Sequence, residues 1–200
     1  EMKLMLIRHG LTEALKKKLY YGATDVPVSE EGFEMLRKLR KTHLYPKAEC
    51  YYTSGMLRAE QTFELLFGDI PHTAVPGLSE MNFGDFEMKS YEELKHDEAY
   101  QRWISGDNMT NVCPNGESYF SFAQRVEKAI RPIIEAGRDA LVVCHGGVIS
   151  SIMTVLFGGA DNPYIYVPEA GYGYQIDFNE GLAPSYKELP EPQSPDPLVF

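Results

Sequence analysis

The sequence has few cysteines, a deficit of positive charge and no apolar run of about 18 residues, the length that a membrane-spanning helix needs. A soluble protein is therefore expected. Its three cysteines, Cys50, Cys113 and Cys144, are an odd number, and no structural disulfide is expected. With 19 Lys and Arg against 29 Asp and Glu, the net charge of −10 argues against nucleic acid and acidic membranes as partners. An anionic substrate would have to be bound by a local cluster of cations.

The length of 200 residues suits one α/β domain over 1–200. Residues 184–200 hold five of the 13 prolines, which predicts an extended or loosely docked proline-rich tail. The first residues do not resemble a signal peptide, because their apolar stretch is short and leads directly into polar sequence. A cytoplasmic protein is the resulting expectation.

Strands and helices are expected to alternate along most of the chain. This order predicts an α/β fold with a mostly parallel central sheet covered on both faces. Short apolar or alternating runs predict strands over 3–7, 50–53, 140–144 and 174–178. Helical spacing and capping residues predict helices over 30–42, 55–67, 91–105, 118–136 and 148–157.

Two of the predicted strands each run directly into a histidine beside a glycine. Residues 3–7 lead into Arg8-His9-Gly10, and residues 140–144 lead into His145-Gly146. In sheets of this type, ligands bind beyond the carboxyl ends of the strands. If both strands are central, the two histidines lie close together.

The neighbouring residues supply the parts that phosphoryl transfer without a metal requires: cations, an in-line nucleophile and a proton donor. Arg8 adjoins His9, and Arg58 lies in the helix predicted over 55–67. Positive neighbours lower the pKa of a histidine, which keeps His9 neutral and nucleophilic. Gly10 lets backbone amides approach an anion. Glu80, among apolar residues, is the candidate acid.

Each of these residues has a simpler explanation when taken alone. His9 could form a hydrogen bond at a strand end, and His145 could belong to a tight turn. Arg58 could be a solvated helix residue, and Glu80 a loop carboxylate. Only their combination favours a catalytic site. No spacing among the five histidines resembles a zinc site, and the others, His43, His72 and His96, are expected in the surface or core.

The candidate residues lie in longer motifs that occur in a recognisable order: 6–13, 21–29, 54–62, Glu80 and His145-Gly146. In this order the motifs resemble the histidine phosphatase superfamily, in its phosphoglycerate-mutase-like branch. The resemblance covers most of the chain. Segments 78–88 and 115–127 are similar to the α-ribazole phosphatase type.

The resemblance implies a three-layer α/β/α sandwich without a metal or organic cofactor. It implies that His9 carries the phosphoryl group, that Arg8, Arg58 and His145 bind the phosphate, and that Glu80 donates the proton. The matched motifs add further candidates for substrate binding, namely Gly10, Thr12, Tyr21, Gly22 and Gly146.

Two positions depart from the family pattern. Leu15 stands where the family often has Asn, and Leu11 replaces a usual acidic or amide residue. A polar phosphate contact is expected to be missing at Leu15, with an effect on affinity or substrate range.

The predicted function is that of a metal-independent phosphomonoester hydrolase that acts through a phosphohistidine. Its partner is a small phosphorylated metabolite, such as α-ribazole 5'-phosphate or a sugar phosphate. One alternative is a cofactor-dependent phosphoglycerate mutase, for which the segment between Glu80 and His145 is short. Another is a non-catalytic module that binds phosphate ligands. The sequence leaves the oligomeric state open, a homodimer included.

Overall fold

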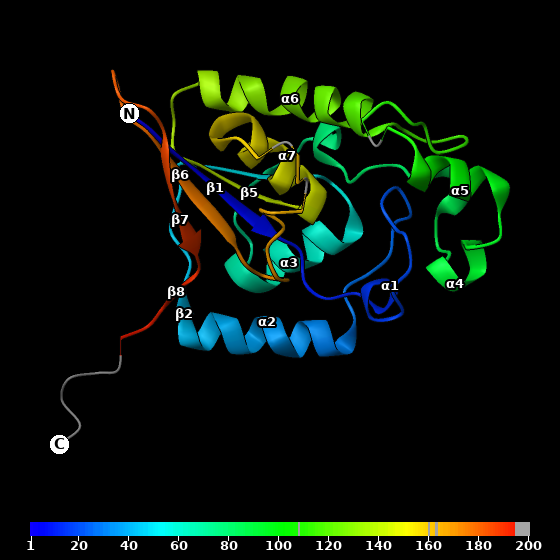
Figure 1. Cartoon of the computed structure of the whole chain (residues 1–200). Helices are drawn as coiled ribbons and strands as arrows, with labels where there is room; N and C mark the ends of the chain where they lie inside the picture. The colour runs from blue at the N-terminus through cyan, green and yellow to red at the C-terminus, as the bar shows by residue number, and fades with distance from the viewer. Residues whose placement is uncertain (108, 160, 163, 195–200) are drawn as a thin grey trace.

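The computed structural model describes all residues except 108, 160, 163 and 195–200. A six-stranded sheet in the order β4-β3-β5-β1-β6-β7 forms its centre (Figure 1). The two middle strands, β1 (Met2–Arg8) and β5 (Ala140–Cys144), are parallel neighbours. The outer strands are β3 (Cys50–Thr53), β4 (Thr73–Ala74), β6 (Gly173–Phe178) and β7 (Ser185–Leu189).

Strand direction divides the sheet into a parallel and an antiparallel part. β4, β3, β5 and β1 run parallel to one another. β6 is antiparallel to β1, and β7 is antiparallel to β6. The prediction of a mostly parallel central sheet is therefore confirmed.

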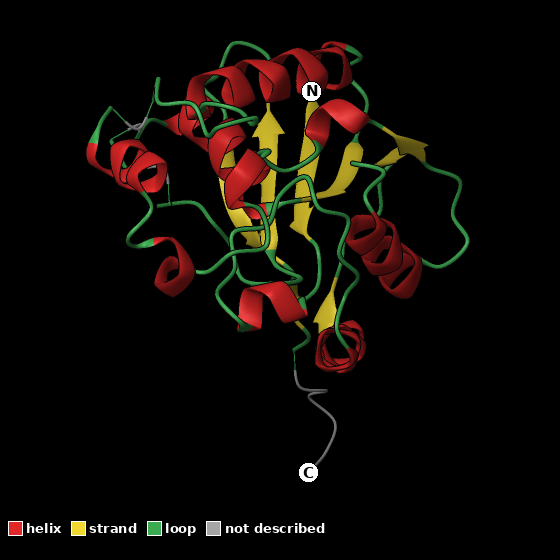
Figure 2. Ribbon diagram, turned by 90° about the vertical axis from the view of Figure 1, so that its right-hand side faces the viewer, coloured by secondary structure: helices red, strands yellow, loops and turns green. Residues whose placement is uncertain are grey.

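Helices lie on both sides of the sheet, as Figures 1 and 2 show. α6 (Tyr119–Glu135) and α7 (Gly146–Phe157) cover one face. α2 (Glu30–Thr42) and α3 (Leu57–Phe67) cover the other. The three-layer α/β/α arrangement implied by the family resemblance is confirmed.

The apolar runs of the central strands are explained by burial on both faces. Successive side chains of a strand point to opposite faces. Leu4 and Leu6 accordingly join the hydrophobic core under α6 and α7, whereas Met5 and Ile7 join the core under α2 and α3. All four side chains are fully buried. Packing on both faces therefore holds β1 in place, together with its carboxyl end at Arg8.

Most helix predictions hold to within two residues. α2 matches its predicted bounds, and the Ser29 side chain caps it by accepting from the Gly32 amide. α6 begins after Ser118, which forms a capping box with Ser121. α3 begins at Leu57, two residues later than expected. α7 begins at Gly146, two residues earlier than expected, so it starts directly after His145.

The prediction of one helix over 91–105 is wrong. The segment forms two helices, α4 (Tyr91–Leu94) and α5 (Glu98–Ser105). The side chain of Asp97 accepts a hydrogen bond from the Tyr100 amide and caps α5. An aspartate in this role favours a new helix start over continuation of the preceding helix.

The proline-rich tail is extended, as predicted, but it is not merely loosely docked. Residues 185–189 form the edge strand β7, and Leu189 is buried in the core under α2 and α3. β8 (Glu191–Pro192) then pairs with β2 (His43–Leu44). The remaining predicted tail residues, 195–200, lie outside the described part of the chain.

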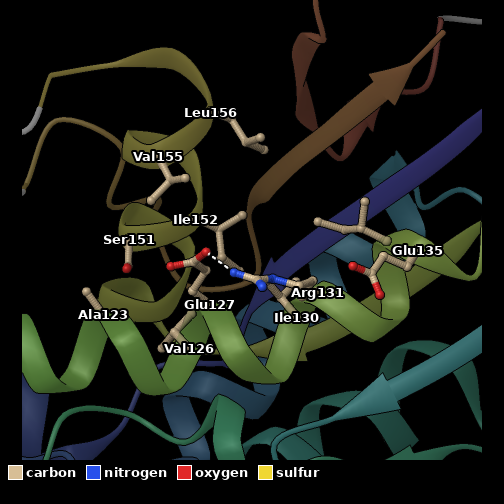
Figure 3. Close-up of a pocket in the computed structure, with 11 residues that line it drawn as sticks. Ala123, Val126, Glu127, Ile130, Arg131, Glu135, Ser151, Ile152, Val155 and Leu156 are labelled. Carbon is tan, nitrogen blue, oxygen red and sulfur yellow. Dashed lines mark hydrogen bonds and ion pairs between the residues drawn. The ribbon is translucent and has the colours of Figure 1, made fainter. Parts of the chain in front are cut away.

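Short elements complete the described chain: α1 (Glu13–Lys16) and the 3₁₀ turns η1 (Pro76–Leu78) and η2 (Gly84–Phe86). Among the described helices, none has the length and apolar character to cross a bilayer. An open groove lies between α6 and α7, lined by apolar residues such as Val126 and Ile152 (Figure 3). It contains none of the predicted site residues.

Candidate active site

His9 and His145 lie side by side at the carboxyl ends of the two central strands. Arg8 is paired with Cys144 across β1 and β5, so the next residue of each strand is a histidine. Their ring centroids are 5.2 Å apart. The expectation that the two histidines meet is confirmed.

The hydrogen bond of His9 defines which ring nitrogen is free. Its Nδ1 lies 2.7 Å from the Gly10 carbonyl oxygen. A carbonyl oxygen only accepts, so Nδ1 bears the proton and Nε2 keeps its lone pair. Burial, together with the charges of Arg58 and Arg8, holds the pKa of His9 well below its usual value. His9 is therefore neutral, with Nε2 available as a nucleophile.

His145 is held by a residue from a third strand end. Its Nε2 lies 2.8 Å from the Ser54 hydroxyl, just after β3. Burial and the neighbouring His9, Arg58 and Arg8 hold the pKa of His145 well below its usual value. A neutral imidazole bonded through Nε2 presents Nδ1 as its second polar atom.

Arg58 is fully buried at the start of α3. Its Nη2 donates to the Gly22 carbonyl at 2.8 Å, and its Nη1 donates to the Thr24 carbonyl at 2.9 Å. The guanidinium carbon is 5.0 Å from the centre of the Tyr21 ring. Burial lowers the pKa of Arg58, but an arginine remains charged at neutral pH.

The Arg8 guanidinium lies directly beside Gly146. The Arg8 Nη1 donates to the Pro168 carbonyl at 2.7 Å. A Cβ atom at Gly146 would lie 3.2 Å from the Arg8 Cζ and 3.1 Å from a Val167 methyl carbon. The glycine thus gives the guanidinium room beside the start of α7.

Arg8, His9, Arg58 and His145 together form what we call the phosphate cradle. Within the described chain, four buried side-chain polar atoms have no protein hydrogen-bond partner: Arg8 Nε, Arg58 Nε, His145 Nδ1 and Thr154 Oγ1. Three of the four therefore belong to the cradle. Buried polar groups are normally paired, and charged N–H groups bind phosphate oxygens strongly. The cradle has the composition of an anion site.

Glu80 lies at the same edge of the sheet. One of its carboxylate oxygens accepts from the Gly147 amide, in the first turn of α7, at 2.9 Å. The other accepts from the Met81 amide at 3.0 Å. A Cβ atom at Gly147 would come within 2.4 Å of Glu80 Oε1, so the second glycine after His145 admits this carboxylate.

Gly10 and Thr12 are tied into the local backbone. The Gly10 amide donates to the Thr62 hydroxyl at 2.8 Å, and that hydroxyl donates to the Arg58 carbonyl at 2.7 Å. The buried Thr12 hydroxyl accepts from the Leu15 amide at 3.1 Å and caps α1. Substrate binding by Thr12 stays a prediction, and Leu15 offers an aliphatic side chain here.

Tyr21 and Gly22 adjoin the cradle from a different loop. The Tyr21 ring centre is 6.3 Å from that of His9. A Cβ atom at Gly22 would overlap the Met81 carbonyl oxygen at 1.6 Å, so this loop packs closely against the segment that bears Glu80.

Reasoning from the sequence assigned no role in the site to Ser54, Thr62 or Glu87. Ser54 and Thr62 lie within the 54–62 motif, which is the signal that could have identified them. Glu87 accepts from the Gly22 and Ala23 amides at 3.0 and 2.7 Å and from the Thr24 hydroxyl at 2.9 Å. These three partners are more than 60 residues away in the sequence, and the local partner, the Phe83 amide at 3.2 Å, does not indicate them.

In the residues that the structure describes, no group of three or more His, Cys, Asp or Glu side chains is arranged to hold a metal ion. The site combines two neutral imidazoles, two guanidinium groups and a carboxyl group at the carboxyl ends of parallel strands. The chain is an α/β protein whose candidate site suits an anionic group such as a phosphoryl group.

Comparison with known proteins gives the family. Residues 4–168 match the model of the histidine phosphatase superfamily (branch 1). The adenosylcobalamin/alpha-ribazole phosphatase of Salmonella typhimurium is 33% identical over 189 residues, covering 91% of this chain and 93% of that protein. The alpha-ribazole phosphatase structure from Shigella flexneri superposes with a TM-score of 0.81 at 30% identity, with 96% of each chain covered.

The chain belongs to the histidine phosphatase superfamily, as the resemblance of its motifs implied. A 2,3-bisphosphoglycerate-dependent phosphoglycerate mutase from Parvibaculum lavamentivorans is also similar, 30% identical over 173 residues, covering 76% of this chain and 79% of that protein. With phosphatases among its similar relatives, the chain is a phosphatase of this superfamily.

Proposed function

We propose that the enzyme hydrolyses phosphomonoesters through a phosphohistidine at Nε2 of His9. The Nε2 lone pair attacks phosphorus while the bond to the leaving oxygen breaks, and Glu80 gives that oxygen a proton. The ionised Glu80 then removes a proton from a water, whose oxygen attacks phosphorus and breaks the P–N bond. Inorganic phosphate leaves, and His9 and Glu80 return to their starting states.

The cradle stabilises charge on the transferred group. Arg8 and Arg58 supply guanidinium N–H groups to the phosphoryl oxygens, and His145 supplies Nδ1–H as a neutral donor. This binding needs no metal in the proposed mechanism. The observation that supports it most is that three nitrogens of the cradle, Arg8 Nε, Arg58 Nε and His145 Nδ1, are buried without a protein partner, while the His145 ring lies 5.2 Å from that of His9.

The experiment that tests this proposal is hydrolysis of p-nitrophenyl phosphate in EDTA by the parent and by His9→Ala. The account expects full activity of the parent and a loss of roughly 10⁴-fold or more in the variant, as for removal of other nucleophiles. Equal activity of the two proteins would remove His9 from the mechanism. Loss of parent activity in EDTA would contradict metal independence.

For the substrate, we propose α-ribazole 5'-phosphate or a related sugar phosphate. This rests on the names of the similar relatives from Salmonella typhimurium and Shigella flexneri. A comparison of kcat/KM for α-ribazole 5'-phosphate, ribose 5-phosphate and phosphoserine would rank these classes. A preference for phosphoserine would reject the proposed substrate.

A phosphoglycerate mutase is the second candidate, since a mutase is among the similar relatives. A mutase protects its phosphoenzyme from water and returns the group to a substrate. The lifetime of the phosphoenzyme in water separates the two activities. A long-lived species that transfers to phosphoglycerate would favour the mutase, whereas no phosphoenzyme and no turnover would favour a non-catalytic binding module.

The cytoplasmic location and the homodimer also remain proposals. Reduced thiols suit the cytoplasm, and Cys50, Cys113 and Cys144 are all free. Sedimentation equilibrium on the 22.6 kDa chain would give its oligomeric state directly.

A further inference from the structure

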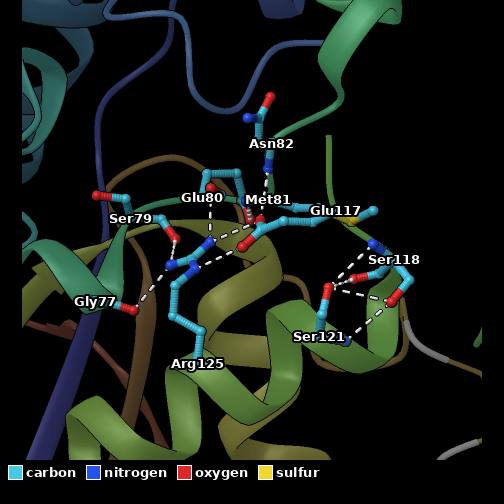
Figure 4. Close-up of polar contacts among 9 residues, drawn as sticks. All are labelled: Gly77, Ser79, Glu80, Met81, Asn82, Glu117, Ser118, Ser121 and Arg125. Atoms are coloured by element: carbon cyan, nitrogen blue, oxygen red, sulfur yellow. Dashed lines mark hydrogen bonds and ion pairs between the residues drawn. The ribbon is translucent and has the colours of Figure 1, made fainter. Parts of the chain in front are cut away.

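Arg125, on α6, donates all five of its N–H groups to protein acceptors (Figure 4). The acceptors are backbone carbonyls around Glu80 and the Glu117 carboxylate. Its Nη1 donates to the carbonyls of Gly77 and Ser79, both at 2.9 Å. Its Nη2 donates to the Glu80 carbonyl at 3.3 Å and to Glu117 Oε2 at 2.9 Å. Its Nε donates to Glu117 Oε1 at 2.7 Å. No hydrogen of this guanidinium is left for another ligand.

Glu117 binds the other side of the same segment. Its Oε2 accepts from the Asn82 amide at 2.8 Å, and its own amide donates to the Asn82 carbonyl at 2.9 Å. Burial opposes ionisation of Glu117, but the bonds from Arg125 and Asn82 outweigh it and lower the pKa of this carboxyl. One ion pair thus holds the backbone before and after Glu80. We call residues 77–82 the acid loop.

The acid loop also rests directly on α6. A Cβ atom at Gly77 would be 2.7 Å from the Ala129 Cβ, one turn beyond Arg125. The Arg125 and Glu117 side chains are only 29% and 21% exposed. Arginine suits this position because its planar fork reaches separate acceptors, whereas lysine has all its N–H groups on one nitrogen.

We propose that Arg125, together with Glu117, is a positioning residue for Glu80 in protonation of the leaving group. This proposal rests on the acid role proposed above for Glu80. Arg125 contacts the main-chain carbonyl of Glu80 and not its carboxyl group, whose oxygens accept from the Gly147 and Met81 amides. The phosphate cradle receives no hydrogen bond from Arg125, so its loss affects the proton step more than phosphate binding.

The test compares Arg125→Lys with the parent on p-nitrophenyl phosphate and on glycerol 2-phosphate, whose alkoxide leaving group needs a proton. Lysine keeps the positive charge, so only the fork is removed. We expect kcat/KM on glycerol 2-phosphate, which reports the steps up to departure of the leaving group, to fall roughly 10- to 100-fold, because small misplacements of catalytic groups cost this much. The loss on p-nitrophenyl phosphate is expected to be clearly smaller, with unchanged competitive inhibition by inorganic phosphate.

Arg131→Lys is the matched control, since Arg131 lies on α6 and forms an exposed ion pair with Glu127. It should leave both activities unchanged. Glu117→Gln, which keeps the side-chain shape, should repeat the leaving-group selectivity of Arg125→Lys. It also provides the test if thermal unfolding shows that the lysine variant does not fold.

A double variant that combines Arg125→Lys with Glu80→Gln separates a failure of the positioning role of Arg125 from a failure of the acid role of Glu80. Arg125→Lys should add no further loss in the Glu80→Gln background, because both changes remove the same proton transfer. Equal losses on the two substrates, or additive losses in the double variant, would overturn the positioning role. If Glu80→Gln alone shows no leaving-group selectivity, the acid role of Glu80 fails, and this proposal falls with it.

Discussion

The phosphate cradle and the acid loop meet at one edge of the sheet, but different forces hold them there. His9 and His145 follow central strands whose apolar side chains are buried on both faces, and Arg58 is itself fully buried. The acid loop depends on hydrogen bonds to a partly exposed ion pair, Arg125 and Glu117. Substitutions in the cradle should therefore affect phosphate binding, and substitutions that disturb the acid loop should affect proton transfer to the leaving group.

Among the substitutions that compare the cradle with the acid loop, Arg58→Lys should have the largest effect, because it removes the planar guanidinium from the cradle. Arg58 donates to the carbonyls of Gly22 and Thr24, and its buried Nε has no protein partner. Loss of a preorganised donor costs roughly 10²- to 10³-fold in rate. We expect kcat/KM to fall by this factor on p-nitrophenyl phosphate and glycerol 2-phosphate alike.

The control for Arg58→Lys is Arg37→Lys, in the exposed ion pair with Glu34 on α2, which should change neither rate. A loss confined to glycerol 2-phosphate would assign Arg58 to the proton step. That result would break the proposed division between cradle and acid loop.

An intermediate effect is expected from alanine at two adjacent glycines of α7. A Cβ atom at Gly147 would displace the Glu80 carboxylate, and one at Gly146 would press on the Arg8 guanidinium. Gly147→Ala should lower kcat/KM on glycerol 2-phosphate about tenfold, less than the roughly 10²- to 10⁴-fold of general acid catalysis, because the Glu80 carboxyl group is displaced and not removed. Gly146→Ala should instead weaken inhibition by inorganic phosphate without leaving-group selectivity.

Both glycines are helical, so alanine itself is compatible with the backbone, and each variant is the control for the other. Steady-state kinetics on the two substrates, with phosphate as inhibitor, make the comparison. The same kinetic defect in both variants would show that cradle and acid loop do not act separately.

The smallest effect concerns pH. The pKa values of His9 and His145 are lowered by burial and by the neighbouring charges, so the unfolded chain binds more protons below about pH 6.5. The contribution of these two histidines to the free energy of unfolding should be constant above pH 6.5 and should fall as the pH drops below that value. The slope is up to about 1.4 kcal/mol per pH unit for each histidine.

Urea unfolding of the parent and of His145→Gln between pH 7.5 and 5 would measure this slope. The variant should lose less stability on acidification than the parent, because one buried neutral histidine is gone. An identical pH dependence of the two proteins would contradict the lowered pKa of His145.

The sequence predicted the proximity of His9 and His145, because this geometry follows from strand order. Apolar runs identified the strands before His9 and His145, and parallel neighbours bring their ends together. The predicted start of the helix that carries Arg58 differs from the observed start of α3 by two residues. These features depend on local patterns and on a general rule for parallel sheets.

The placement of Glu80 could not be predicted in the same way. Its position depends on Arg125 and Glu117, which lie 45 and 37 residues further along the chain. The break between α4 and α5 depends on the capping side chain of Asp97, and β7 on pairing with β6. Such long-range or single-residue contacts leave no periodic pattern in a sequence.

The most direct test of the central claim is to locate the phosphoryl group on the enzyme. The parent would be mixed with p-nitrophenyl phosphate for milliseconds and quenched in alkali, which preserves phosphohistidine, and its peptides would be analysed by mass spectrometry. The account predicts one modified residue, His9, substituted at Nε2 because Nδ1 donates to the Gly10 carbonyl. A phosphoryl group on His145, or on Nδ1 of His9, would contradict it.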